Sequence, residues 1–397
     1  MKKVQRSIRF PYTVFIFIVG LGISFNDVGL KRQGTLSAWF HNINFHILMT
    51  FVPAATVYAT QGINHIILRR CAKETMVFSV GTLGMSTAVS ALYAFSFLET
   101  KNVRNSVLFG ILLCTVERVP VADELFKEGR YPVLTTMLQA ETIVNNLVVW
   151  SFLRQMASKS DTVFSARLHS LLLSHVGGAL CGAAMGMAAI RSLRLAPQSQ
   201  SSNTVLLILL TYLTFCLLEV AGASGVDGVV VFTLVTNAHR RVACTELEGL
   251  LHKYWSAIYN LVGLVSLFMS SLCLGELLLI FFEMEQLQSA LLSYCVRTGA
   301  RIFSLVALFP IIEQIGYPVS WRQAVITVWM GLKGPLNITV ASYYYHAEAS
   351  RNVDFVSKTL LHVACDILLS QLINLTLLEF VFRLFGKAPG FTPGTID

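Results

Sequence analysis

The sequence is poor in charge. Asp, Glu, Lys and Arg make up 13% of its 397 residues, whereas 54% are hydrophobic. A soluble globular domain carries about 25% charged residues. Long polar stretches are lacking too, since the longest are RLAPQSQSSN and the tail GKAPGFTPGTID. We therefore expect no soluble domain in this chain, and the repeated apolar runs of about 20 residues indicate a multi-pass integral membrane protein.

Several motifs of other protein classes are also missing. There is no Gly-rich phosphate loop, nucleophile elbow or HExxH-like pair, so we expect no enzyme and no cofactor. The eight cysteines stand singly, without CxxC or metal-ligand spacing, and predict neither a disulfide framework nor a metal centre. The net charge of +8 comes from bases in short loops between apolar runs, which indicates membrane topology and not nucleic-acid binding.

What is present is a long series of apolar segments. We expect about twelve transmembrane helices, the first of them retained because no A-x-A-like cleavage site follows MKKVQRSIRF. Lys and Arg concentrate on one side of this arrangement, which predicts that both termini are cytoplasmic. The expected spans are 10–27, 44–62, 75–98, 104–126, 131–154, 168–190, 203–220, 224–238, 254–281, 287–312, 319–345 and 354–384.

Two of these spans contain helix-breaking residues. Span 104–126 contains CTVERVPVADELF, with Pro120 in the apolar pattern, and span 319–345 contains WMGLKGPLNITV, with Pro335 between apolar residues. Freed backbone at membrane depth survives only where protein or water satisfies it. One broken helix in each half of a chain is typical of a transporter site between inverted repeats. We therefore expect the two breaks to cross near the midplane.

Glycine is spaced regularly in one further span. Gly178, Gly182 and Gly186 lie four residues apart within 168–190, so all three fall on the same face of the predicted helix. Small residues at this spacing allow two transmembrane helices to approach closely. The pattern predicts a packing surface.

The span 131–154 carries polar side chains at its centre. Glu141 and Asn145 lie four residues apart and share one helix face, and Asn146 lies about 100° further round. One interpretation is a cation site, because carboxylate and amide oxygens can replace a hydration shell. The other is structural, with Glu141 paired to a base of the second half and the amides bonding between helices.

Two bases of the second half need partners. Arg301 lies within an apolar span and keeps its charge, so we expect it to pair with Glu141. Lys333 lies between two glycines at the second break. We expect its amine to neutralise the C-terminal dipole of a broken helix or a carboxylate at the crossing.

These segments together resemble the monovalent cation/proton antiporters of the sodium/proton exchanger type. CTVERVPVADELF looks like the broken-helix segment of that family, QAETIVNNLVVW its ion-site helix, GARIFSLVALF its arginine-bearing helix, and WRQAVITVWMGLKGPLNITVA its second broken helix. The similar segments occur in family order over nearly the whole chain. The resemblance implies one exchanger-like domain over 1–397, with 75–154 and 287–384 as an ion-transporting core and the rest as a dimerising scaffold.

The chain departs from the family at the ion site itself. The resemblance aligns the family's Asn-Asp pair with Asn145 and Asn146, so the working carboxylate has become an amide, which neither releases a proton nor carries charge. The family's broken-helix acid aligns with Glu117, and the residue after it is Arg118. A family glutamate aligns with Tyr58.

Three functions follow from this comparison. The first is cation/proton antiport, with Glu117, Thr115, Asn145 and Asn146 binding the transported ion. Under this hypothesis Glu141, Arg301, Lys333 and Arg118 compensate charge. The second is a transport-incompetent relative that serves another membrane protein, with Arg118 neutralising Glu117. The third is an uncoupled ion pathway, because fixed amides bind without protonation. Monovalent cation, proton, lipid bilayer and a second copy of the chain are the expected partners.

Overall fold

The computed structural model is helical almost throughout. It describes residues 12–29, 35–98, 102–117, 131–157, 164–195, 199–243, 245–281, 284–317 and 319–385, and no strand occurs in these ranges. Among the helices described, six are long and apolar enough to cross a membrane, namely those in α5, α9, α10, α12, α13 and the α15–α16 segment. Shorter apolar helices lie in α2, α6 and α11. The expected all-helical polytopic architecture is confirmed.

The helices run in the order α2 (Tyr12–Gly29), α3 (Thr35–Gln61), α4 (His65–Arg70), α5 (Ala72–Phe97), α6 (Val103–Cys114), α8 (Pro132–Ala157), α9 (Phe164–Leu195), α10 (Gln200–Val220), α11 (Gly225–Ala243), α12 (Thr245–Phe281), α13 (Met284–Ile315), α14 (Trp321–Trp329), α15 (Pro335–Leu369), the π-helical turn η1 (Ser370–Leu375) and α16 (Thr376–Phe385).

Most boundaries lie within a few residues of the expected spans, and the differences have simple causes. Helices α3 and α12 begin at Thr35 and Thr245, well before the apolar runs that mark 44–62 and 254–281. Hydropathy detects only the apolar part of a helix, so it does not predict these polar first turns. The short helix α4 is not predicted either. It begins where the Asn64 side chain accepts hydrogen bonds from the N–H groups of Ile66 and Ile67.

Helices α9 and α11 pack with their backbones in near contact. A Cβ on Gly182 would lie 2.3 Å from the carbonyl oxygen of Gly228, and one on Gly178 would lie 2.4 Å from that of Ser224. One turn further along α9, Gly186 faces Val235. The glycine pattern of 168–190 thus lies at a helix–helix contact in which no larger residue fits.

The segment from Pro335 to Phe385 folds back on itself. A straight helix with the 35 residues of α15 would span about 50 Å. Yet the N–H of Lys333 donates to Ser370 Oγ at 3.0 Å, and Gln371 Nε2 donates to the Lys333 carbonyl at 2.7 Å. The chain therefore returns to its starting point by residue 370, as the two expected spans 319–345 and 354–384 require.

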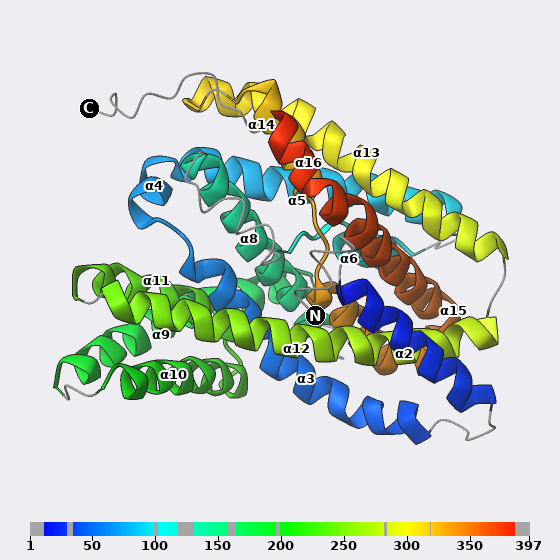
Figure 1. Ribbon diagram of the computed structural model, residues 1–397, viewed down its shortest axis with the longest axis horizontal. Coiled ribbons are helices and arrows are strands. Elements are labelled where there is room, and N and C mark those ends of the chain that lie inside the picture. The colour runs from blue at the N-terminus through cyan, green and yellow to red at the C-terminus, as the bar shows by residue number, and fades with distance from the viewer. Residues whose placement is uncertain are drawn as a thin grey trace.

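The helices form two groups (Figure 1). In the first, α5 packs against α6, α8 and α13, α13 packs against α15, and α14 packs against α16. In the second, α11 packs against α3, α9 and α10, and α12 packs against α2 and α3. Contacts of α3 with α8 and α15, and of α12 with α15, join the groups. The two interrupted spans belong to the first group and face the second.

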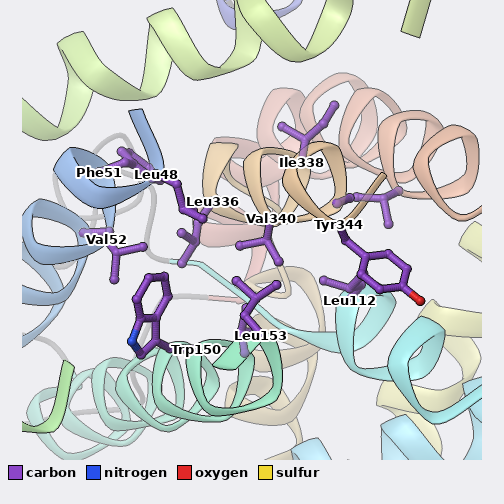
Figure 2. Packing of buried hydrophobic residues seen from close by; sticks show 14 of the residues in the cluster. Leu48, Phe51, Val52, Leu112, Trp150, Leu153, Leu336, Ile338, Val340 and Tyr344 are labelled. Atoms are coloured by element: carbon purple, nitrogen blue, oxygen red, sulfur yellow. The ribbon is translucent and has the colours of Figure 1, made fainter. Parts of the chain in front are cut away.

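The largest hydrophobic cluster lies between the groups, as Figure 2 shows. Leu48, Phe51 and Val52 of α3 approach Trp150 of α8 and Leu336 of α15. Leu112, two residues before the end of α6, belongs to the same cluster. The core therefore lies beside both chain breaks and holds the polar groups described next in fixed positions.

Candidate functional site

The two interrupted spans meet through their non-helical residues, 115–117 and 330–334. This meeting place, with the side chains that reach it, is called the crossing. Helix α6 ends at Cys114 and residues 115–117 are not helical, while residues 330–334 separate α14 from α15. The N–H of Glu117 donates to the Leu332 carbonyl at 3.1 Å, which joins the breaks by their main chains. Protein groups thus satisfy the backbone that each break frees, as a membrane interior demands.

The carboxylate of Glu117 lies at the N-terminus of α15. Its Oε1 accepts from the N–H of Asn337 at 2.8 Å, and its Oε2 accepts from the N–H of Leu336 at 3.1 Å and the hydroxyl of Tyr259 at 3.3 Å. The first N–H groups of a helix have no intrahelical partner and carry partial positive charge. Glu117 therefore gains a preorganised anion site, and only 4% of the residue is exposed.

Gly334 makes this arrangement possible. A Cβ at this position would lie 2.2 Å from Glu117 Oε2. Gly331 plays the same part on the other side of Lys333, where a Cβ would lie 2.7 Å from Cδ of Arg301. Both glycines of the second break therefore make room for a charged side chain from another element.

Lys333 lies between these glycines and is 1% exposed. Its Nζ donates to the carbonyl oxygens of Leu112, at 3.3 Å, and Thr115, both at the C-terminal end of α6. Asp366 Oδ2 lies 4.0 Å from the same nitrogen. The amine thus stabilises the negative end of the α6 dipole and faces a carboxylate, and the sequence had predicted these two roles as alternatives.

Glu141 and Arg301 form a bidentate ion pair. Arg301 Nη1 donates to Glu141 Oε1 at 2.8 Å and Nη2 donates to Oε2 at 3.0 Å. Thr82 adds a hydroxyl bond to Oε1 at 3.0 Å, and Arg301 Nε reaches the Thr327 carbonyl near the end of α14. The structure brings together the two residues that the sequence suggested as partners. Their fork geometry and burial leave neither charge exposed to lipid.

A second buried pair was not predicted. Arg297 Nε donates to Asp366 Oδ1 at 2.7 Å, and its Nη1 donates to the Gly331 carbonyl at 3.2 Å. Arg297 precedes Arg301 by one helical turn, so the sequence does place both guanidinium groups on one face of α13. The sequence places Asp366 inside an expected span but does not predict its pairing with Arg297, because that acid reaches the crossing only through the fold-back after Pro335.

The amide residues contribute in different ways. Asn145 Nδ2 donates to the Val116 carbonyl at 3.1 Å, while its Oδ1 is buried without a partner among the residues described. Asn146 is 4% exposed, and its side chain shows no hydrogen bond within the described ranges. Thr115 Oγ1 donates to Asn337 Oδ1 at 2.8 Å, and the Thr115 carbonyl accepts from Asn337 Nδ2. Asn145 thus ties α8 to the first break, and Asn337 ties that break to α15.

Two residues that the sequence singled out, Arg118 and Tyr58, are not among the described side chains of the crossing. Arg118 is outside the described residues, so its relation to Glu117 is not part of this geometry. Tyr58, which stands where the resemblance places a glutamate, stacks on Tyr259 with ring centroids 4.8 Å apart. Tyr259 in turn donates to Glu117, so an aromatic pair lies next to the carboxylate.

Within the described residues, the crossing is balanced in charge. Its described side chains comprise three acids and three bases, and each helix end there meets a group of opposite sign. Glu141 and Asp366 have basic partners, whereas Glu117 is held only by N–H and O–H donors within the described structure. It is therefore the carboxylate whose charge a proton or a cation could neutralise without breaking an ion pair.

Comparison with known proteins identifies the family. The family model described as sodium/hydrogen exchanger, transmembrane, matches residues 3–382. The chain belongs to the sodium/hydrogen exchanger family. Sodium/hydrogen exchanger 7 of Arabidopsis thaliana is 23% identical over 96% of this chain, and the Na(+)/H(+) antiporter ApNhaP of Aphanothece halophytica is 24% identical over 83% of it. The chain spans only 35% of the length of the plant exchanger and 62% of that of ApNhaP.

Solved exchanger-family structures share the fold. The sodium proton antiporter MjNhaP1 from Methanocaldococcus jannaschii at pH 8 superposes with a TM-score of 0.72 at 15% identity, over 97% of this chain and 95% of that one. A second MjNhaP1 structure, from electron microscopy, gives 0.75 at 14% identity. At this identity the likeness shows the architecture alone. This exchanger-family protein is thus an integral membrane protein of the antiporter fold.

Proposed function

We propose that this protein exchanges a monovalent cation, sodium in the first instance, for protons by alternating access, with Glu117 as the carboxylate for which the two ions compete. The observation that carries the proposal is the setting of Glu117. Its carboxylate lies at the crossing and is held by two helix N–H groups and the Tyr259 hydroxyl, with no basic side-chain partner among the described residues. Its relatives that are named as sodium/hydrogen exchangers or antiporters support the same ions.

The surrounding oxygens suit a dehydrated cation. An ionised carboxylate offers about four lone-pair sites, of which three accept hydrogen bonds in Glu117. Asn145 presents an unpartnered Oδ1, and its Nδ2 is bonded to Val116, the residue before Glu117. Thr115 Oγ1, in exchange for its bond to Asn337, and the Asn146 amide would complete the shell. Hard monovalent cations bind such neutral and charged oxygens in place of water.

The two helix groups suggest how access alternates. The group containing α5, α6, α8 and α13 to α16 holds the crossing, and the group of α2, α3 and α9 to α12 faces it across the hydrophobic cluster. We assign the first as the transporting core and the second as a scaffold that pairs with a second copy. In this assignment both ends of the described chain face the cytoplasm, in keeping with the distribution of Lys and Arg.

One observation favours a second candidate, an exchanger fold that no longer transports and acts as a membrane partner. The acids and bases described at the crossing balance one another, and Asn146 supplies an amide where the resemblance places the working acid. A site that is already neutral gains less from a cation than one with an unpaired carboxylate.

Proton efflux from liposomes that contain the purified protein tests the proposal. Sodium, potassium or lithium added outside should drive efflux in the wild type, and Glu117→Gln should abolish it because an amide does not titrate. Asp354→Asn is the control, since that acid is exposed and pairs only with Lys358 one turn away. Undiminished flux in Glu117→Gln would show that another group carries the ions. A flat wild-type trace would favour the second candidate.

A further inference from the structure

A tyrosine of the second helix group contacts the Glu117 carboxylate, which belongs to the first. The hydroxyl of Tyr259, on α12, donates to Glu117 Oε2 at 3.3 Å. The other two described donors are the N–H groups of Leu336 and Asn337 at the start of α15, in the same group as Glu117. Of the three described bonds to this carboxylate, the one from Tyr259 therefore crosses between the groups.

The ring of Tyr259 is held by its own helix group. It stacks on Tyr58 of α3, with ring centroids 4.8 Å apart and an interplanar angle of 18°, and the ring of Phe51 on the same helix lies 5.5 Å away. Helix α3 packs against α12, and Tyr259 is buried. The hydroxyl therefore stays with the second group when the two groups move relative to one another.

Gly263 brings α12 close to the start of α15. It lies one helical turn after Tyr259. A Cβ at this position would lie 2.9 Å from Cγ of Pro335, the first residue of α15, and 3.6 Å from Cε2 of Phe51. A larger residue would push α12 away from the helix end that binds Glu117. The contact with the carboxylate thus depends on close packing of the two groups at this point.

The strength of the Tyr259 bond depends on the charge of Glu117. A hydrogen bond to an ionised acceptor is roughly twice as strong as one to a neutral acceptor. A proton or a cation on the carboxylate neutralises it, and so weakens all three bonds to it. The two N–H bonds lie within the first group, so their weakening does not separate the groups. Weakening of the Tyr259 bond does loosen the attachment of one group to the other.

Other described bonds between the groups lack this dependence. Trp150 Nε1 of α8 donates to Glu219 Oε1 of α10 at 2.8 Å, and Thr13 Oγ1 of α2 donates to Gln371 Oε1 at 3.1 Å. Neither bond involves Glu117, so neither responds directly to its charge. They provide a comparison for the bond that does.

We propose that the Tyr259–Glu117 bond holds the two helix groups together while the carboxylate is charged and empty, and that a proton or a cation releases them by neutralising it. The inference rests on the proposed function, in which the first group moves against the second. An exchanger leaks when its empty site crosses the membrane, because a cation then moves without a proton in return. Tyr259 thus enforces one-for-one exchange.

Tyr259→Phe in liposomes tests the inference, since it removes the hydroxyl and keeps the ring stacks. The measurement is the number of protons released per radioactive sodium ion taken up, with valinomycin and equal potassium on both sides to dissipate charge. This ratio should be close to unity in the wild type. In Tyr259→Phe, sodium uptake without proton release should rise on the order of tenfold, the effect of losing one charge-assisted hydrogen bond.

Thr13→Val is the matched control. It also removes a hydroxyl bond between the groups, but one that does not reach the carboxylate, so its ratio should stay at the wild-type value. An exchanging wild type beside a Tyr259→Phe variant with an unchanged ratio would overturn this inference alone. A wild type without exchange would overturn the proposed function and this inference with it.

Two further measurements separate this role from its rivals. The sodium KM of Tyr259→Phe should be unchanged or lower, and a severalfold increase would make the hydroxyl an ion ligand and overturn the inference. Thermal unfolding in detergent needs no transport. Tyr259→Phe should lower the midpoint in the wild-type background and lower it less in a Glu117→Gln background, because the charge is absent there. Equal decreases in both backgrounds would contradict a charge-dependent bond.

Discussion

At the scale of single residues, the crossing depends on small side chains placed between large charged ones. Gly331 and Gly334 flank Lys333, and each leaves space that a charged group from another helix fills. The glycines were recognised in the sequence as helix breakers. Their second role is to leave space for Arg301 and Glu117. The sequence does not predict this role, because it depends on which helices pack at the crossing.

The tightest of these contacts gives a direct prediction. Gly334→Ala should destabilise the protein by about 1–3 kcal/mol, the usual cost of overpacking, because its Cβ would lie 2.2 Å from Glu117 Oε2 and push the carboxylate off the α15 N-terminus. Thermal unfolding in detergent measures the change. Gly84→Ala in α5 is the control, since nothing lies within 4 Å of its Cβ, and it should be neutral or slightly stabilising. Equal effects of the two changes would contradict this account.

The sequence identifies the site residues unequally, because only some of their partners can be inferred from local patterns. Glu141 and Arg301 stood out because each is a charge inside an apolar run with a possible partner in the other half. The contacts of Lys333 with the end of α6 follow from its place at a break. The partner of Asp366 was not predicted, because its approach to Arg297 depends on how the chain after Pro335 turns back. No local pattern encodes that turn.

At the scale of elements, helix ends account for most of the polar contacts at the crossing. The α15 N-terminus meets Glu117, the α6 C-terminus meets Lys333, and the α14 C-terminus meets Arg297 through the Gly331 carbonyl. Apolar periodicity predicts that these helices exist and roughly where they stop. It does not predict α4 or the polar first turns of α3 and α12, because those segments lie outside the apolar runs.

The α9–α11 contact offers a paired test at this scale. Gly182→Ala should cost about 1–3 kcal/mol of stability, because its Cβ would lie 2.3 Å from a backbone oxygen that cannot move without shifting α11. Gly177→Ala on the same helix meets only the Ala223 Cβ at 4.0 Å, so it should be tolerated. Unfolding midpoints of the two variants provide the comparison. A tolerated Gly182→Ala would mean that the helices are free to separate.

At the scale of the whole molecule, the proposed ion exchange would operate at a crossing whose described charges balance. Buried ion pairs hold each charged group in place, and separating one by removing a partner typically costs about 3–5 kcal/mol. A cation entering such a site must therefore compete with existing contacts. In this protein Glu117 is the carboxylate at which that competition disrupts no pair.

Restoring an acid at Asn146 changes this balance. Asn146→Asp adds a carboxylate to a buried residue whose side chain has no described hydrogen bond, so cation-dependent proton flux in liposomes should rise above that of the wild type. Asn146→Gln, which keeps the amide, should not raise it. If Asn146→Asp and the wild type are equally inactive, the chain is no latent exchanger. The crossing would then serve folding alone.

The main-chain bond between Glu117 and Leu332 has a mechanical consequence. It belongs to the peptide backbone, so no exchange of one side chain for another, other than proline at position 117, can delete it. A displacement of one break is transmitted to the other without passing through any charged group. The two interruptions are joined at Glu117 and Leu332, so one break cannot move away from the other without losing this bond.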